Sequence, residues 1–326
     1  MRVLKRLSAL VVSAIVLTLL AACGSEEGSG GNSGGSTVVI GTAGSSGTFY
    51  AVGAGMSQII NNHSEKLTAV SQGTNGATEN VRLLKAGTVQ VGFGNWDALH
   101  FGYNGEGPFA GEKQGTMSLM NLYLSGGQMV VRESSDIVSF EDLRGKRINL
   151  GPPGSTITDM SIIILKEHGI DPEEDIRPYY LDFAEGGRML RDGDLDATFF
   201  VAGIPTAGVI DLSSSSEIRL LSLDDEMRES IIEQYPYYDR LTIPAGTYNG
   251  VDYDVETLQL WTSLMVHEDL PDEIAYELVS TLVENLDEFK EVHSVGADFS
   301  LENAVLAPIP LHPGAEKFYK EKGVME

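Results

Sequence analysis

Residues 79–93, ENVRLLKAGTVQVGF, recur in pattern at residues 185–199, EGGRMLRDGDLDATF, and this repeat is the best guide to the architecture. Both stretches read E-x-x-R-x-L-(K/R)-x-G-x-(V/L)-x-x-x-F. In residues 79–93 the first half predicts a short helix that ends at a glycine, and the second half predicts a strand. The second copy, residues 185–199, predicts the same order of a short helix, a glycine and a strand. The repeat therefore predicts two α/β lobes of similar build, each around a parallel sheet.

Each copy of the repeat follows a strand, a glycine-rich loop and a helix. Residues 37–41 predict a buried strand, followed by a Gly/Ser/Thr loop and a helix to about residue 62. Residues 147–150 and 151–155 repeat the strand and the loop, and Thr156 with Asp159 can cap the next helix. Ligands of open α/β sheets bind beyond the carboxyl ends of the strands, so we expect a ligand cleft between the lobes.

Two apolar runs predict the crossings between the lobes. Residues 123–131 carry the chain into lobe two, and residues 257–266 bring it back. We place lobe one at residues 37–126 plus 259–326, and lobe two at residues 127–258. Three further helices are expected: an amphipathic one over 271–290, a terminal one over 317–323, and one that begins at Pro205.

The N-terminus predicts export from the cytoplasm. A basic start and an apolar run over residues 7–20 are typical of a secretory signal peptide over residues 1–22. Cys23 follows Leu20-Ala21-Ala22, which resembles a bacterial lipobox and predicts lipidation of Cys23. The alternative is an ordinary signal peptide with an incidental cysteine. Residues 23–36 are rich in Gly and Ser and predict a flexible tether to the membrane.

The composition excludes several classes of function. The chain of 326 residues has a net charge of −25, and removal of the signal leaves about −28. This acidity argues against nucleic-acid binding, which needs a basic surface. Cys23 is the single cysteine, so no thiol remains for a disulfide, a metal cluster or a nucleophile.

Three loops predict a site for a small anion. Residues 44–50, 72–76 and 154–156 each offer backbone N–H groups and hydroxyls at the start of a helix. Turn and capping chemistry explains any one of them, but three at one face favour a ligand. No lysine completes a phosphate loop, so a nucleotide site is not expected. The predicted ligand-binding residues are Gly44, Ser45, Ser46, Thr48, Tyr50, Thr74, Asn75, Gly76, Asn95, Gly154, Ser155, Thr156, Phe200, Ala202 and Gly203.

The sequence offers no catalytic constellation. The histidines do not form a metal-ligand pair, and no G-x-S-x-G motif occurs. Arg82 and Arg188 are interpreted as structural or surface residues, and Trp96 either as core or as a wall of the pocket. We therefore predict no enzyme activity, no cofactor and no metal site.

Several motifs, taken in order, resemble the TAXI family of extracytoplasmic solute-binding proteins, which serve TRAP transporters. The resemblance spans residues 37–323. Its marks are residues 40–44 with Phe49-Tyr50, residues 74–80, 142–147, 151–155, 192–203, 243–248 and 312–315. Where the family commonly has Thr-Gly-Gly-Ser, this chain has Thr74-Asn75-Gly76-Ala77, which leaves the ligand open.

The resemblance implies a two-lobed periplasmic-binding-protein fold of the second type, which closes on a small organic anion. Glutamate, glutamine or a dicarboxylate such as 2-oxoglutarate is implied as ligand, and membrane subunits driven by an ion gradient are implied as partners. Two alternatives remain. One is a lipid-anchored receptor of an ABC importer for sulfonates or thiamine precursors, and the other is an enzyme or sensor that kept the fold.

Overall fold

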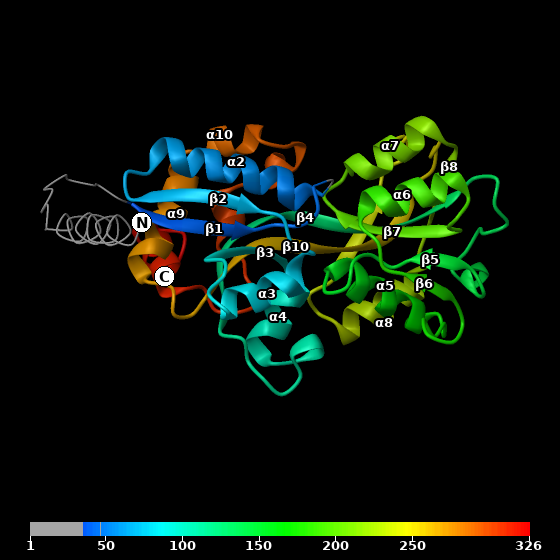
Figure 1. Cartoon of the computed structure of the whole chain (residues 1–326), viewed down its shortest axis with the longest axis horizontal. Helices are drawn as coiled ribbons and strands as arrows, with labels where there is room; N and C mark the ends of the chain where they lie inside the picture. Colours follow the sequence, from blue (N-terminus) through cyan, green and yellow to red (C-terminus); the bar gives the residue numbers. More distant parts are fainter. Residues whose placement is uncertain (1–34, 46) are drawn as a thin grey trace, which may run out of the picture. The chain divides into compact units, whose positions relative to one another are not determined.

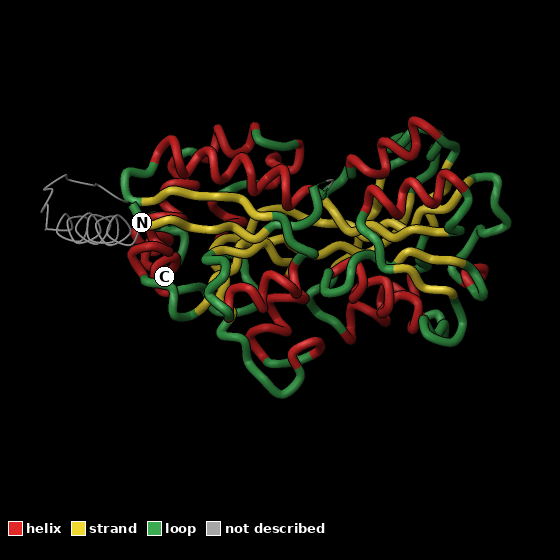
Figure 2. Tube along the Cα trace, in the orientation of Figure 1, coloured by secondary structure: helices red, strands yellow, loops and turns green. Residues whose placement is uncertain are grey.

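The computed structural model describes residues 35–45 and 47–326, which form a mixed α/β fold. Ten strands of these residues make one sheet in the order β2-β1-β3-β10-β4-β7-β5-β6, with β8 beside β4 and β9 beside β10. Helices cover both faces of the sheet (Figure 1, Figure 2). The predicted signal peptide, Cys23 and the tether as far as residue 34 lie outside the described residues.

Lobe one is the body built on β1, β2 and β3. Its elements are β1 (Ser36–Gly41), α2 (Thr48–His63), β2 (Leu67–Gln72), α3 (Ala77–Lys85), β3 (Val91–Asn95) and α4 (Trp96–Asn104). Strand β1 runs parallel to both neighbours, and Ile40 lies beside Val91 and Gly41 beside Gly92. The helix predicted to end at about residue 62 and the helix predicted from about Thr78 are confirmed as α2 and α3.

Lobe two repeats this arrangement. Its elements are β5 (Arg147–Asn149), α5 (Thr156–Glu167), β6 (Arg177–Tyr179), α6 (Phe183–Asp192) and β7 (Ala197–Ala202). Strand β5 is parallel to β6 and β7, with Ile148 beside Ala197 and Asn149 beside Thr198. The two parallel units predicted by the repeat are confirmed.

The cap of α5 differs from the prediction by one residue. Ser155, and not Thr156 with Asp159, caps the helix: its Oγ accepts a long hydrogen bond from the N–H of Thr158 at 3.4 Å. Ser155 takes this role because it is the last residue with extended backbone before the helix. Thr156 and Asp159 are thus free for contacts outside the helix.

Two long strands cross between the lobes. Strand β4 (Thr116–Arg132) and strand β10 (Val255–His267) pair with each other in antiparallel fashion. In addition β10 pairs with β3 of lobe one, and β4 pairs with β7 of lobe two. The predicted crossings are therefore the central strands of the sheet. The predicted lobe boundaries fall inside these strands and stay a prediction.

The remaining elements correct three sequence-based boundaries. They are β8 (Ile218–Leu221), β9 (Asp239–Ile243), α7 (Ala207–Ser215), α8 (Asp225–Gln234), α9 (Asp272–Glu284), α10 (Leu286–Glu291), α11 (Leu301–Ala304), α12 (Pro313–Glu321) and the 3₁₀ turns η1 (Gly107–Phe109), η2 (Glu141–Leu143) and η3 (Ser294–Asp298). The helix expected over 271–290 breaks at Asn285. Helix α7 begins after Thr206 and not at Pro205, and α12 begins at Pro313, where His312 Nδ1 accepts from the N–H of Gly314 at 3.2 Å.

The apolar core divides along the same lines as the repeat. One cluster includes Ile40, Phe93 and Phe318 in lobe one. In lobe two, Phe199 packs in a cluster on one face of β7, and Phe200 packs in another on the opposite face. Because successive side chains of a strand point to opposite faces, β7 is buried on both sides, as is usual for a strand of a parallel sheet.

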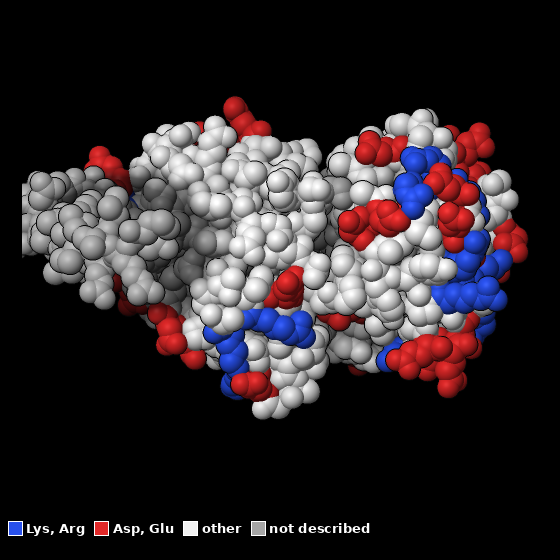
Figure 3. All heavy atoms as spheres, in the orientation of Figure 1, with Lys and Arg blue, Asp and Glu red and all other residues white. Residues whose placement is uncertain are grey.

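Charged side chains are intermixed on the surface. On the face seen in Figure 3, basic residues gather over β5, β6 and α6 among acidic ones. Ion pairs near these elements include Lys146, which precedes β5, with Asp136, and Arg188 of α6 with Glu185. Within the described residues, no helix combines the length and the apolar character that a membrane crossing requires.

Candidate ligand-binding site

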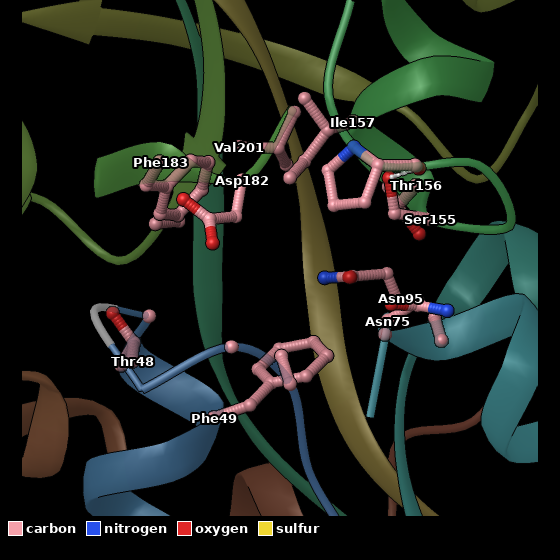
Figure 4. A pocket seen from close by; sticks show the side chains of 17 residues that line it. Thr48, Phe49, Asn75, Asn95, Ser155, Thr156, Ile157, Asp182, Phe183 and Val201 are labelled. Carbon is pink, nitrogen blue, oxygen red and sulfur yellow. Dashed lines mark hydrogen bonds between the residues drawn. The ribbon is translucent and has the colours of Figure 1, made fainter. Parts of the chain in front are cut away.

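A cavity of about 60 Å³ lies between the two lobes, beyond the carboxyl ends of the parallel strands. The first turns of α2 and α3 border it from lobe one, and those of α5 and α6 border it from lobe two (Figure 4). This is the position that strand topology predicts for a ligand of an open α/β sheet.

The structure brings about half of the predicted ligand-binding residues to this cavity. The cavity is lined by Gly44, Thr48, Asn75, Gly76, Asn95, Ser155, Thr156 and Ala202. Ser45, Tyr50 and Thr74 line an adjoining open hollow, which shares Gly44 and Asn75 with the cavity. Ser46 lies outside the described residues. Contact of any of these residues with a ligand stays a prediction.

Three predicted residues lie away from the cavity wall. Phe200 is fully buried in the core, where its ring packs against Phe183 at a centroid distance of 4.8 Å. Gly203 is packed under Val295, because a Cβ added at Gly203 would approach Val295 Cγ1 to 2.2 Å. The Gly154 carbonyl accepts a hydrogen bond from the N–H of Glu79 at 3.2 Å and so joins the lobes.

Thr74 has a structural role that the sequence did not reveal. Its Oγ1 donates to the Thr42 carbonyl at 2.8 Å and accepts from the N–H of Gly76 at 3.1 Å. The hydroxyl therefore fixes the loop that leads into α3. We expect Thr74 to shape the site through this loop, with its hydroxyl already occupied.

Several residues of the cavity wall were not among the predicted ligand-binding residues, although Gly47 and Phe49 belong to the predicted loop over residues 44–50. They are Ala43, Gly47, Phe49, Ala77, Pro152, Ile157, Asp182, Phe183 and Val201. Two of these could have been found from the repeat. Asp182 and Phe183 precede Glu185 as Gly76 and Ala77 precede Glu79, and the loop before Glu79 was already a candidate.

Backbone donors dominate the chemistry of the cavity. The N-cap residues of α2 and α3 are Gly47 and Gly76, and neither helix start has a side-chain cap. Within the described part of the chain, the N–H groups of Thr48, Phe49 and Ala77 have no hydrogen-bond partner. Such N–H groups at helix starts attract carboxylate oxygens, since the helix dipole adds positive potential there.

Among the described residues that line the cavity, Asp182 is the one ionisable residue. Its Oδ1 accepts from the N–H of Glu185 at 2.9 Å and caps α6. In Figure 4 its carboxylate points into the cavity, toward the side formed by Thr48 and Phe49. The wall thus combines N–H donors, one negative charge and the apolar surfaces of Phe49, Phe183 and Val201.

The lobes touch directly beside the cavity. Thr156 of α5 donates its hydroxyl hydrogen to Asp97 Oδ1 of α4 at 2.9 Å. Thr78 of α3 donates to Asp159 Oδ2 of α5 at 3.4 Å. These contacts hold the cavity closed in this structure. Among the described residues, no three His, Cys, Asp or Glu side chains come together as a metal site.

Comparison with known proteins gives the family. The model of the NMT1-like family matches residues 40–323. The chain belongs to the NMT1-like family. This match covers both lobes and both crossing strands, so the family assignment applies to the whole described fold.

Solved structures support the fold class. The binding-protein component of an ABC phosphonate transporter from Pseudomonas aeruginosa is 11% identical, with a TM-score of 0.53, over 82% of this chain and 80% of that chain. A putative L-cystine ABC transporter protein from Listeria monocytogenes is 14% identical, with a TM-score of 0.50, over 81% of this chain and 98% of that chain. At this identity the likeness concerns the fold, and the expected two-lobed periplasmic-binding-protein fold is confirmed.

Proposed function

We propose that this NMT1-like protein is an extracytoplasmic receptor that binds a small solute between its lobes and delivers it to a membrane transporter. The observation that carries the proposal is the cavity between the lobes, at the carboxyl ends of the parallel strands of each lobe. Strands β4 and β10 are the connections on which the lobes hinge. The ligand favours the closed form because it contacts both lobes at once.

The chemistry of the wall supports an organic acid that also carries an amine. A ligand carboxylate fits the N–H groups at the starts of α2 and α3. The Asp182 carboxylate, in turn, favours an ammonium group of the ligand beside it. Among the expected ligands, glutamate or glutamine satisfies both demands, whereas 2-oxoglutarate lacks the amine.

Calorimetric titration of the mature chain, with Cys23→Ser, tests the ligand class. The panel comprises L-glutamate, L-glutamine, 2-oxoglutarate and taurine. We expect the two amino acids to bind, and binding by no member would contradict the proposed ligand class.

Asp182→Asn keeps the helix cap, because Asn caps as well as Asp. It should weaken amino-acid binding about tenfold or more. 2-Oxoglutarate provides the contrast, since its binding should not weaken.

The membrane partner has two candidates. Similarity to binding proteins of ABC importers supports an importer of that type, which we favour on the comparisons. The motifs over residues 37–323 support TRAP subunits instead. In membranes that hold the transporter, ATPase activity stimulated by the liganded receptor would favour the first. Uptake that requires only an ion gradient would favour the second.

The leader supports a membrane-bound receptor. Cleavage before Cys23, lipidation of Cys23 and a Gly/Ser tether that ends before β1 begins at Ser36 would keep the lobes near their partner. A tether of this length spans about 20 Å on average. Cys23→Ser should release a receptor that still binds its ligand. Fractionation of cells into membrane and soluble parts measures this release.

A further inference from the structure

A buried carboxylate of lobe one lies at the contact between the lobes. Asp97 is the second residue of α4, and its side chain is fully inaccessible to solvent. Its Oδ1 accepts from the N–H of Ala98 at 2.7 Å and from the hydroxyl of Thr156 at 2.9 Å. Its Oδ2 is buried and has no hydrogen-bond partner among the residues that the structure describes.

A second carboxylate enters the same contact from lobe two. Asp159 lies in the first turn of α5, and its Oδ2 accepts from the hydroxyl of Thr78 on α3. Each acid is therefore held by a threonine of the opposite lobe. The titratable groups around the pair are Arg82 of α3, His100 of α4, Glu106 after α4, and Tyr235, Tyr237 and Tyr238 after α8.

This environment disfavours two negative charges. Burial, with the nearby Asp159 carboxylate, raises the pKa of Asp97 to about 7. Burial also raises the pKa of Asp159 to about 6, against the opposing effects of the Thr78 hydroxyl and Arg82. Since Arg82 is exposed, it neutralises the pair only weakly. The phenol oxygens of Tyr237 and Tyr238 are buried, have no hydrogen-bond partner within residues 35–45 and 47–326, and bring no positive charge.

We infer that closure of the lobes is coupled to the uptake of a proton by the Asp97–Asp159 pair. The inference rests on the proposed function, because it needs a receptor that opens and closes. In the open cleft both carboxylates face water and ionise near their ordinary values. In the closed cleft, a proton on one acid removes the repulsion between the two carboxylates. It also removes the desolvation cost of burying a second negative charge.

The direction of the pH dependence follows from linkage. Closure raises both pKa values from about 4, so the closed form holds more protons than the open form between about pH 4 and pH 7. Closure is therefore favoured at low pH. It loses this advantage as pH rises to about 7, and it changes little above that. Ligand affinity should follow the same course.

A ligand-free experiment tests the coupling. The mature chain with Cys23→Ser receives a spin label on each lobe, at Asn62→Cys and Glu174→Cys, both of which are exposed. Distance distributions are recorded at about pH 5 and about pH 8. The ratio of closed to open molecules should be about tenfold higher at the lower pH. An unchanged ratio would overturn the inference.

Variants assign the effect to the pair. Asp97→Asn combined with Asp159→Asn should abolish the pH dependence. Asp136→Asn is the matched control, because Asp136 is an exposed acid of lobe two that pairs with Lys146. It should keep the full dependence. Asp159→Asn alone should move the transition to lower pH, because Asp97 then loses its charged neighbour. A double variant that retains the dependence would contradict the assignment.

Two further measurements separate this inference from related possibilities. If sodium chloride favours closure at about pH 8 and choline chloride does not, the pair binds a metal cation, and the proton assignment is wrong. Titration with L-glutamate and L-glutamine should give affinities about tenfold weaker at about pH 8 than at about pH 5. If neither ligand binds while the distances respond to pH, the proton coupling stands and the amino-acid ligand is wrong.

Discussion

Lobe one and lobe two build the same helix–strand unit, yet they place its buried amide on different elements. In lobe one the amide belongs to helix α3. The Asn80 side chain is fully buried, and its Nδ2 lies within hydrogen-bond distance of three carbonyls, those of Gly41, Thr42 and Phe93, at 3.2, 2.8 and 2.9 Å. The neighbouring strand supplies a glycine, since a Cβ on Gly41 would lie 2.7 Å from Asn80 Oδ1.

In lobe two the amide belongs to strand β5. Asn149 occupies the place of Gly41 and donates to Thr198 Oγ1 at 3.1 Å. The helix now supplies the glycine, because a Cβ on Gly186, the counterpart of Asn80, would lie 2.3 Å from Asn149 Nδ2. The difference teaches that the unit needs one amide between helix and strands and has no room for a second side chain.

The largest predicted effect comes from moving the amide of lobe one to the position it has in lobe two. Asn80→Gly leaves buried carbonyls without donors, and Gly41→Asn brings two amides into collision. Each change alone should lower the free energy of unfolding by about 3 kcal/mol. The double variant should recover more than half of the summed loss, because it recreates the arrangement of lobe two. Denaturation in urea measures the free energy of unfolding of the single and double variants. If the two losses simply add in the double variant, the lobes do not share one arrangement of amide and glycine.

A pair of adjacent glycines in α6 gives an intermediate effect. Gly186→Ala should cost about 2 kcal/mol, because the new Cβ meets Asn149 Nδ2 at 2.3 Å and Thr198 Oγ1 at 2.9 Å. Gly187→Ala is the matched control, with its nearest neighbour, Leu212, at 3.6 Å. It should gain up to about 1 kcal/mol from helix propensity. If the two substitutions change thermal unfolding equally, contact with Asn149 is not the reason why position 186 requires glycine.

The arginines of the repeat provide the smallest effect. Arg188 pairs with Glu185 and Asp192 on the surface, with 47% of its side chain exposed. Arg82 instead packs over Phe109 and lowers the pKa of Asp159 across the lobe contact.

Arg82→Gln should therefore raise the pKa of Asp159, so the closed form keeps its proton to higher pH. In this variant, the pH at which ligand affinity decreases should be higher by about half a pH unit. Arg188→Gln should leave the profile in place and change stability by less than about 0.5 kcal/mol. Affinity measured against pH compares the two. If Arg188→Gln shifts the pH profile of affinity as much as Arg82→Gln does, the two arginines do not differ in their effect on closure.

Much of the fold could be predicted from local signals. The repeat predicted two parallel units, and the glycine after Lys85 and the alternation of Val89, Val91 and Phe93 predicted α3 and β3. The loops before α2, α3 and α5 were predicted to meet, and eight of the predicted site residues line the cavity. The error at Phe200, a predicted site residue, concerns the direction in which its side chain points. Phe200 lies in a strand buried on both faces, so no polar alternation shows which way its side chain points.

The sequence by itself determined the repeated units, the strands that cross between them and the helix starts that face the cleft, because these depend on periodicity and on glycine and capping residues close in the chain. Only the tertiary structure decided that Asp182 points into the cavity, that Thr74 turns its hydroxyl inward, and that Asp97 and Asp159 both lie at the contact between the lobes. The physical reason is that burial and charge proximity arise when segments distant in sequence pack together. The repeat therefore specifies two similar lobes, and their contact makes Arg82 and Arg188 different.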